Sequence, residues 1–381
     1  MTPGNRIVLL ENGAEYFPAL EAAFDAAERE IYLESYIFEN DATGRRVAAA
    51  LCRAARRGAA THVLLDGFGS RTLSREVMED FRRAGVHLLF YRPELRLWRL
   101  RRHRLRRLHR KLAAIDGGIA FVGGINIIDD MDTPGQIPPR YDYAVRVEGP
   151  LAEKIMGAAR HLWGLVAWSQ LKRRSLTRQE MREIPTLAGE TRAFFLIRDN
   201  LRHRHDIEEA YLAAIAGAQR EIVIANAYFL PGRRFRHALA EAARRGVRVV
   251  LLLQGRVEYV LLHYASRALY GTLLDAGVEI HEYHHSFLHA KVAVVDGHWA
   301  TVGSSNIDPF SLLLAREANV VVDDPAFAEE LRASLERAMR EGARRMLPLQ
   351  WENQPLHRRF FTWLSYGMVR LLMGMVGYAN E

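Results

Sequence analysis

The chain of 381 residues contains one cysteine, Cys52, and this scarcity excludes two ways of stabilising a fold. One cysteine cannot form an intrachain disulfide, and a zinc site built from several cysteines is impossible. The apolar run at residues 7–10 is too short for a signal peptide, and no membrane-spanning segment follows it. Long low-complexity stretches are also missing. We therefore expect a globular protein of a reducing compartment whose attachment to any membrane is peripheral or is made elsewhere in the chain.

The length and the charge of the chain indicate its number of domains and its class of partner. A chain of this length is too long for one ordinary core and suits two domains of about 150–200 residues each. The formal net charge is +8 and the pI is about 9.7. A basic balance of this size indicates an anionic partner: a nucleic acid, an acidic membrane surface or a phosphate-bearing substrate. Composition alone does not choose among these three.

An internal duplication is visible at a constant offset of 180 residues. The segment HRKLAAID at 109–116 matches HAKVAVVD at 289–296, and GGIN at 123–126 matches GSSN at 303–306. A histidine, a lysine, an aspartate and an asparagine all match at this one offset, which chance would rarely produce. The sequence therefore predicts two copies of one domain.

The duplication extends upstream and predicts the fold class. Residues 29–38 resemble residues 220–229, and the segment ARRG occurs at both 55–58 and 243–246, where it marks helix C-termini. Short apolar strands alternate with helices, which indicates a sheet covered by helices on both faces. We expect an α/β protein of two duplicated α/β sandwich domains, related by a pseudo-twofold axis and sharing one active site.

The expected domain boundaries follow from the repeat and from composition. Polar residues with Pro185 and Gly189 suggest a linker between the copies. We expect four segments in chain order: an N-terminal domain at 1–170, a linker at 171–191, a C-terminal domain at 192–345 and an apolar tail at 346–381.

The His-x-Lys pairs carry the chemistry. Side chains at i and i+2 of a strand share a face, so His109 lies beside Lys111 and His289 beside Lys291. Two such faces meeting across the axis surround one anionic phosphate. One imidazole can attack phosphorus and form a phosphohistidine, while the other protonates the leaving alcohol and then deprotonates the acceptor. The lysines balance charge on the phosphate oxygens.

Further residues of the repeat are expected at the same site. Small residues and amides after each motif are predicted to bind phosphate: Gly124, Asn126, Ser304, Ser305 and Asn306. Asp142 and Glu317 occupy matching places after the motifs, and they either orient the histidines or are surface charges. Asp116 and Asp296 each precede a glycine at a strand end, so both a catalytic role and a turn role stay open.

We expect neither a metal ion nor another cofactor. The chemistry above is complete with histidine, lysine and amide groups. His281, His284 and His285 lie close together in the sequence, but they lack cysteine partners and a carboxylate at ligand spacing.

The paired motif resembles the phospholipase D superfamily, whose signature is His-x-Lys-x4-Asp-x6-Gly-Gly/Ser-x-Asn in two copies. Within it the chain is similar to bacterial cardiolipin synthases of the short type, which lack N-terminal transmembrane helices. The most specific segments are FLHAK at 287–291 and TVGSSNIDP at 301–309, and the similarity runs from about residue 7 to 348. Gly124 departs from the pattern, because serine is commoner there, and the departure removes one hydroxyl donor.

The resemblance implies an activity and an order of roles. Such enzymes join two phosphatidylglycerols, or phosphatidylglycerol and another phospholipid, and release a small alcohol. The family implies that His109 is the nucleophile and His289 the acid and base, although the residues themselves are symmetric about this order. A lipid hydrolase, a nucleic-acid phosphodiesterase and a non-catalytic membrane-binding protein are the alternatives.

Two segments indicate where a membrane makes contact. Residues 92–111 interleave nine arginines with leucines and Trp98, which suits an anionic bilayer, a nucleic acid or a solvated loop. Residues 360–378 are strongly apolar but short for a span and include Arg370, which indicates an interfacial helix or a helix packed on the core. We expect an anionic phospholipid substrate and a peripheral position on the cytoplasmic side of the bacterial inner membrane, and no nucleic acid.

Overall fold

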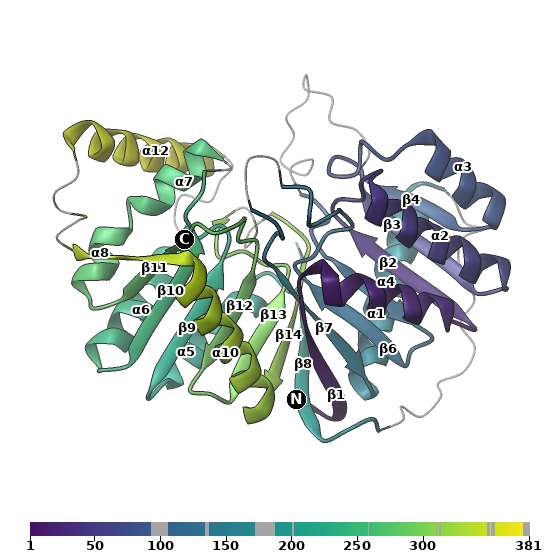
Figure 1. The fold of residues 1–381 in the computed structure, drawn as a ribbon, viewed down its shortest axis with the longest axis horizontal. Helices are drawn as coiled ribbons and strands as arrows, with labels where there is room; N and C mark the ends of the chain where they lie inside the picture. Colours follow the sequence, from purple (N-terminus) through teal and green to yellow (C-terminus); the bar gives the residue numbers. More distant parts are fainter. Residues whose placement is uncertain are drawn as a thin grey trace.

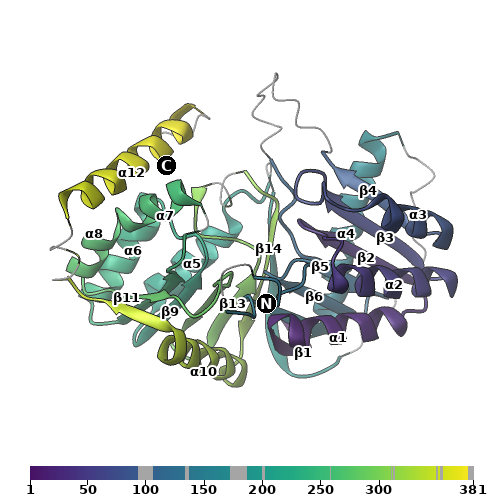
Figure 2. The same cartoon turned by 45° about the horizontal axis from the view of Figure 1, so that its top comes forward.

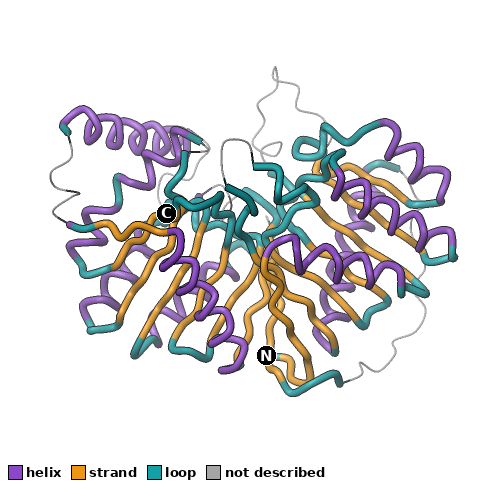
Figure 3. Tube along the Cα trace, viewed as in Figure 1, coloured by secondary structure: helices purple, strands orange, loops and turns teal. Residues whose placement is uncertain are grey.

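The strands of the molecule form one continuous sheet with helices on both faces (Figures 1 and 3). This computed structural model describes residues 1–92, 106–133, 137–171, 187–199, 202–257, 259–309, 311, 314–348, 351 and 355–375. Within them the sheet has 15 strands in the order β15-β11-β10-β9-β12-β13-β14-β8-β1-β7-β6-β5-β2-β3-β4.

The N-terminal half alternates strands and helices up to the first motif and ends in a long helix. Its elements are β1 (Thr2–Glu11), α1 (Asn12–Asp25), β2 (Glu30–Ser35), α2 (Ala42–Arg56), β3 (Ala60–Asp66), α3 (Arg75–Ala84), β4 (His87–Tyr91), β5 (Leu112–Ile115), β6 (Ile119–Gly123), β7 (Tyr143–Glu148) and α4 (Pro150–Ser169).

The C-terminal half repeats this order and adds a strand and a helix at its end. Its elements are β8 (Thr191–Arg198), α5 (Asp206–Gly217), β9 (Glu221–Asn226), α6 (Arg233–Arg244), β10 (Arg248–Gln254), α7 (Val260–Arg267), α8 (Tyr270–Asp275), β11 (Glu279–Tyr283), β12 (Lys291–Val295), β13 (Trp299–Gly303), β14 (Glu317–Asp323), α10 (Pro325–Gly342), β15 (Ala343–Met346) and α12 (Leu356–Met375).

The sheet order reads the same outward from its centre in both halves. From β1 the order is β7, β6, β5, β2, β3 and β4, and from β8 it is β14, β13, β12, β9, β10 and β11. The equivalent strands β1 and β8 pair with each other in antiparallel fashion, with Thr2 opposite Ala193. The halves are therefore related by a pseudo-twofold axis through the middle of the sheet, and the duplication expected from the sequence is confirmed.

Local sequence signals explain where the helices begin and end. The carboxylate of Asp41 caps α2 by accepting from the Gly44 amide at 2.7 Å, which explains why this helix begins at Ala42. Gly58 and Gly246 follow the ends of α2 and α6 with φ of 105° and 91°. Glycine adopts this left-handed conformation without strain, which lets the chain turn at once into the next strand.

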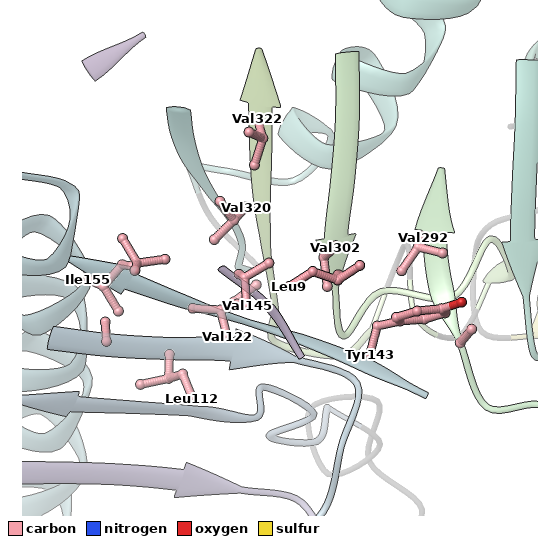
Figure 4. Close-up of a cluster of buried hydrophobic side chains, with 14 of the residues drawn as sticks. Leu9, Leu112, Val122, Tyr143, Val145, Ile155, Val292, Val302, Val320 and Val322 are labelled. Atoms are coloured by element: carbon pink, nitrogen blue, oxygen red, sulfur yellow. The ribbon is translucent and has the colours of Figure 1, made fainter. Parts of the chain in front are cut away.

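The central core takes side chains from both halves. Leu9 and Val122 of the N-terminal half lie in one buried cluster with Val302 and Val320 of the C-terminal half (Figure 4). A second cluster lies under the outer helices of the N-terminal half, and a third lies under those of the C-terminal half. Because the central cluster is shared, burial of apolar surface holds the two halves in one relative position.

Some expectations fall at the edges of what the structure describes. Most of the expected linker, at 172–186, and most of the basic segment, at 93–105, lie outside the described residues, as do 376–378 of the apolar tail. Strand β15 pairs with β11 and extends across the expected boundary at residue 345. Within the described part of the chain, no helix is long and apolar enough to cross a bilayer.

Candidate active site

The two His-x-Lys motifs are brought together where each half touches the other. The amide of His109 donates to the carbonyl of Arg316 at 3.0 Å, just before β14. In the equivalent contact, the amide of His289 donates to the carbonyl of Tyr141 at 2.7 Å, just before β7. The backbone of each motif is thus hydrogen-bonded to a residue that lies just before a strand of the opposite half. These two bonds hold the histidines in place relative to one another.

Each histidine pairs with a carboxylate from the other half. Nδ1 of His109 lies 2.9 Å from Oε1 of Glu317, and Nδ1 of His289 lies 2.6 Å from Oδ2 of Asp142. Both carboxylates are buried. The pairing engages Nδ1 of each ring and leaves Nε2 on the side of the ring that faces away from the carboxylate. Of the two roles considered for Asp142 and Glu317, this geometry supports the orienting one.

The lysines are buried beside the histidines. Nζ of Lys111 donates to the carbonyl of His109 at 2.7 Å, and Nζ of Lys291 makes the equivalent bond to the carbonyl of His289. Burial, assisted by the neighbouring Lys291 and opposed by Glu317, lowers the pKa of Lys111 to about 7. Each ammonium group also lowers the pKa of the histidine in the opposite half. The two lysines and the two histidines are therefore electrostatically coupled.

Burial also shifts the pKa values of the histidines and of Asp142. Burial lowers the pKa of His109, and it lowers that of His289 well below the usual value, with added repulsion from Lys291 and Arg140. Burial raises the pKa of Asp142 to about 6. Near pH 7 the empty site therefore holds neutral imidazoles, whose Nδ1–H group can donate to the carboxylate.

The turn after each motif lies beside the motif itself. The amide of Gly123 donates to the carbonyl of Lys111 at 3.1 Å, which places GGIN against the first motif. Oδ1 of Asn126 accepts from the Ile37 amide at 3.2 Å. In the C-terminal half, Oδ1 of the buried Asn306 has no hydrogen-bond partner in the described structure.

The turn of the C-terminal half also includes Ser304 and Ser305. The hydroxyl of Ser304 donates to Oε2 of Glu317 at 2.5 Å, so it holds the carboxylate that orients His109. The hydroxyl of Ser305 lies 3.4 Å from the carbonyl of Asn306. Both serines are buried.

The departure at Gly124 has a structural reason. A Cβ added at Gly124 would collide with the carboxylate of Asp142. The side chain of Asp142 is one methylene shorter than that of Glu317. Its carboxylate lies close to the backbone of Gly124, whereas in the other half the Ser304 hydroxyl bonds to the carboxylate of Glu317. The pair Gly124–Asp142 therefore replaces the pair Ser304–Glu317, and the two half-sites differ in size and in hydroxyl content.

Asp116 and Asp296 are not brought to the histidines. They follow the far ends of β5 and β12, and each carboxylate accepts three backbone amides: those of residues 28, 29 and 30 for Asp116, and of residues 219, 220 and 221 for Asp296. Both residues have φ of 52°. Of the two roles left open by the sequence, the turn role fits this placement, because strand length separates the carboxylates from the site.

Two residues near the site were not predicted from the sequence. The ring of Tyr36 lies edge-on to His109 with 5.0 Å between centroids, and Nζ of Lys111 lies 5.5 Å from the centre of the same ring. Arg140 stacks on Phe287 and contributes to the lowered pKa of His289. Neither residue lies in a His-x-Lys motif or in the turn that follows it.

Comparison with known proteins places this geometry in a family. The family description "Cardiolipin synthase, PLD-like domain" matches residues 20–131 and 211–339. Cardiolipin synthase B of Shigella flexneri is 45% identical over 333 residues, which cover 87% of this chain and 80% of that protein. The chain belongs to the cardiolipin synthase family of phospholipase D-like proteins. The resemblance inferred from the motifs is confirmed.

More distant relatives agree with this family and with the fold. A probable cardiolipin synthase of Bacillus subtilis is 31% identical over 88% of this chain and 66% of its own length. The crystal structure of phosphatidylserine synthase from Haemophilus influenzae Rd KW20 has a TM-score of 0.70 at 14% identity, covering 98% of this chain and 95% of that one. The expected α/β fold class is confirmed. Family membership makes the protein a phosphatidyltransferase of the phospholipase D superfamily.

The described residues contain no group of three or more histidine, cysteine, aspartate or glutamate side chains arranged to hold a metal ion. His284 lies near Glu282, with 3.6 Å between Nε2 and Oε2, but that carboxylate also pairs with Arg267 at 3.1 Å. These groups form a salt-bridge network in the C-terminal half.

Proposed function

We propose that the protein transfers a phosphatidyl group from phosphatidylglycerol to the hydroxyl of a second phosphatidylglycerol, releasing glycerol and forming cardiolipin. The observation that carries the proposal is the crossed pairing of His109 with Glu317 and of His289 with Asp142. Two oriented imidazoles facing one buried cationic site suit a two-step displacement at a phosphodiester.

In the first step, Nε2 of His109 attacks phosphorus, and the bond from phosphorus to the glycerol oxygen breaks. Glu317 supports the positive charge that develops on the His109 ring. His289 donates the proton from its Nε2 to the departing glycerol. This role needs a protonated His289. Burial, with added repulsion from Lys291 and Arg140, holds the pKa of His289 well below its usual value, and the negative charge of the bound phosphodiester opposes that effect and favours the protonated ring.

In the second step, Nε2 of His289 removes the proton from the acceptor hydroxyl. The acceptor oxygen attacks phosphorus, and the bond between phosphorus and Nε2 of His109 breaks. The product diester leaves, and both histidines return to their starting states. Water in place of the acceptor alcohol gives phosphatidic acid, so the same site hydrolyses lipid to the extent that water enters.

The phosphate oxygens are held by charges and dipoles that are already in place. Lys111 and Lys291 balance the negative charge, and their contacts to the motif carbonyls keep them beside the histidines. The amide groups of Asn126 and Asn306, the hydroxyl of Ser305 and the backbone at Gly124 provide neutral donors.

We further propose that α12 and the basic segment at 92–111, apart from its largely buried end at His109, Arg110 and Lys111, hold the enzyme on the cytoplasmic face of the bacterial inner membrane as a peripheral protein. Phe361, Trp363 and Leu371 of α12 are 54%, 60% and 64% exposed, which is unusual for large apolar side chains on one helix. Anionic lipid suits the net charge of the chain.

Incubation of the protein with radiolabelled phosphatidylglycerol in vesicles tests the activity. We expect cardiolipin and an equal amount of glycerol, both lost in His109→Ala and in His289→Ala. Phosphatidic acid without cardiolipin would make the protein a hydrolase. Cleavage of single-stranded DNA faster than lipid would favour a nucleic-acid phosphodiesterase.

A further inference from the structure

Arg140 lies beside His289 and has no charged counterpart in the other half of the site. Asp142 follows it by two residues, and Glu317, the equivalent carboxylate of the other half, follows Ala315 by two residues. The two half-sites thus share their histidine and lysine but differ in charge at this position. Only the half-site of the second motif carries a guanidinium where the other carries a methyl group.

The position of Arg140 is fixed by contacts with the segment that carries the second motif. Its guanidinium carbon lies 4.8 Å from the centre of the Phe287 ring, and that ring lies 6.4 Å from the ring of His289, centroid to centroid. The amide of Tyr141 donates to the carbonyl of Phe287 at 2.8 Å, and the amide of Arg140 donates to the carbonyl of Asp130 at 2.8 Å. Both the backbone and the side chain of Arg140 are therefore held beside the motif.

The charge of Arg140 is not neutralised within the part of the chain that the structure describes. Its guanidinium forms no ion pair with a described carboxylate, and its Nε atom is buried without a hydrogen-bond partner there. The nearby carboxylate of Asp142 is engaged elsewhere, since its Oδ2 lies 2.6 Å from Nδ1 of His289 and 3.9 Å from Nζ of Lys291. A partly buried arginine without a counter-charge is typical of a site that binds an anion.

Arg140 acts electrostatically on the reacting histidine. Burial is the main cause of the low pKa of His289, and after Lys291 the largest repulsion comes from Arg140, ahead of Lys111. Lys111 is itself one of the lysines that balance the charge of the donor phosphate in the proposed reaction. A guanidinium that acts on His289 more strongly than Lys111 does is close enough for a bound anion to lie beside that phosphate.

The proposed reaction brings a second phosphate to this side of the site. The departing and the entering alcohol take the same place on phosphorus, opposite Nε2 of His109 and beside Nε2 of His289. In phosphatidylglycerol, only the glycerol carbons separate the free hydroxyl from the lipid's own phosphodiester. When His289 holds that hydroxyl, the second phosphate lies one glycerol length away, on the side where Arg140 is placed.

The half that supplies His289 also carries the proposed membrane contact. Figure 2 shows α12 lying along α7 on the C-terminal half. A lipid acceptor stays anchored in the bilayer by its acyl chains, and this arrangement is consistent with an acceptor that is served by the C-terminal half.

We propose that Arg140 binds the phosphodiester of the acceptor phospholipid while His289 removes the proton from its hydroxyl. The inference rests on the proposed function and adds the group that selects the acceptor. Lys111 and Lys291 balance the donor phosphate, so Arg140 discriminates among acceptors. Water and uncharged alcohols offer no anion to Arg140, and the site therefore favours transfer to an anionic phospholipid over hydrolysis.

Partition of the phosphatidyl-enzyme between two acceptors tests the proposal. The vesicles contain radiolabelled phosphatidylglycerol together with monoacylglycerol, an uncharged lipid that also has free glycerol hydroxyls. Both acceptors react with the same intermediate and use His289 as the base. A change in the first step, or in the pKa of His289, therefore cancels in the ratio of cardiolipin to phosphatidyl-monoacylglycerol, and this product ratio measures the selection of the acceptor.

Loss of the Arg140 charge should change the product ratio. We expect it to fall about tenfold to 100-fold in Arg140→Ala, which copies the alanine of the other half. Arg140→Gln keeps a polar side chain that can pack on Phe287, so it serves where Arg140→Ala lowers stability, and it should show a similar fall. Arg140→Lys should lie between these variants and the wild type.

The control for these variants is Arg82→Ala on α3, where the arginine side chain is 74% exposed, and it should leave the product ratio unchanged. Because the products are radiolabelled, the ratio can be measured even where total turnover is low. A ratio that stays constant in both Arg140→Ala and Arg140→Gln, however far turnover falls, would show that Arg140 only positions His289 and would overturn the proposal.

Soluble acceptors give a second readout that does not depend on the vesicle surface. Glycerol and glycerophosphoglycerol have the same kind of hydroxyl and no acyl chains, and only the second has a phosphodiester. We expect the wild-type KM for glycerophosphoglycerol to be about tenfold or more below that for glycerol, and the two values to converge in Arg140→Ala. Equal KM values in the wild type would contradict the acceptor site.

The failure of this inference can be told apart from the failure of the proposed function. A wild-type protein that makes phosphatidic acid and no cardiolipin refutes the proposed function, and the inference falls with it. A wild-type protein that makes cardiolipin, with a product ratio that does not change in the Arg140 variants, keeps the function and refutes the role of Arg140.

Discussion

The Nδ1 atom of His109 lies 2.9 Å from Oε1 of Glu317, and the two residues are 208 positions apart in the chain. His289 and Asp142 make the matching contact in the opposite direction. Each half of the molecule supplies one imidazole and the carboxylate that orients the other imidazole. Neither half contains a complete pair, so the site exists only where the halves meet.

Because each carboxylate orients the histidine of the opposite half, the turnover of the enzyme should depend equally on Glu317 and on Asp142. Glu317→Gln and Asp142→Asn should each lower kcat by about 100-fold or more, because an amide holds the imidazole in a different tautomer and gives no charge support. Glycerol release from phosphatidylglycerol vesicles measures the effect, with Glu76→Gln on the exposed face of α3 as the control. Near-normal turnover in either variant would refute the orienting role.

Gly124 should tolerate no side chain. Gly124→Ser should lower kcat about tenfold to 100-fold, since its Cβ pushes Asp142 and hence His289 out of position. Ser304→Gly is the matched change in the other half, and it should cost less, because it removes a hydrogen bond to Glu317 without a collision. The same assay of glycerol release compares the two variants, and a larger loss in Ser304→Gly would contradict this explanation.

Asp296 should contribute to stability and not to chemistry. Asp296→Ala removes an acceptor of three backbone amides and should lower the free energy of unfolding by about 1–3 kcal/mol, measured by urea denaturation. Asp296→Asn keeps one oxygen acceptor and should cost less. The kcat of the folded Asp296→Ala protein at low temperature should stay near that of the wild type. A large loss of kcat in this folded variant would instead support a catalytic role for Asp296.

The stability effect of Asp296 should depend on pH. Partial burial opposes ionisation, but the three amides lower the folded pKa of this carboxyl. A lowered folded pKa means that the stabilisation is present above the unfolded pKa, near 3.8, and is lost as the pH falls through the folded value. The difference in unfolding free energy between wild type and Asp296→Ala should therefore shrink in acid.

The activity should fall as the pH rises through the pKa of Lys111. In the empty enzyme that pKa is about 7, so deprotonation above this pH removes a charge that phosphate binding needs. Bound phosphate favours the ammonium form, and the alkaline limb of kcat should lie at higher pH than that of kcat/KM. The guanidinium of Lys111→Arg stays charged, so this variant should lack the limb near pH 7. A kcat/KM that stays flat to pH 9 in the wild type would exclude this role.

The apolar face of α12 should govern binding to vesicles. Phe361→Glu with Leu371→Glu should weaken binding to anionic vesicles at least tenfold, measured by flotation, because charged groups cannot enter the acyl region. Leu165→Glu with Trp168→Glu places the same charges on exposed sites of α4 and should have little effect. An equal loss of activity on detergent-dispersed lipid would show instead that α12 is needed for the fold.

The sequence predicted the parts of the molecule that depend on local pattern and repetition. The alternation of strands and helices, and the placing of His and Lys on one strand face, follow from periods of 3.6 and 2 residues. The shared site followed from two motifs in one register. Asp142 and Glu317 were found by their matching positions, but the sequence could not say that each partners the opposite histidine, because long-range contacts leave no periodic signal.

Other features depend on packing that the sequence does not encode locally. The sequence predicted two sandwich domains that share a site, but it did not predict that β1 and β8 pair and join the two sheets into one. Tyr36 has no counterpart that marks it, because the equivalent position in the other half is Ala227. The reason for Gly124 became visible only with the position of the Asp142 carboxylate.

The pairing of β1 with β8 also governs how the chain folds as it is synthesised. Residues of β1 leave the ribosome before those of β7 and can pair with them once the N-terminal half is complete, with Leu9 opposite Val145. The other edge of β1 stays open until β8 has been made, and open strand edges readily pair with those of other chains. The nascent chain is therefore most prone to aggregate while the ribosome is translating the region between the two halves.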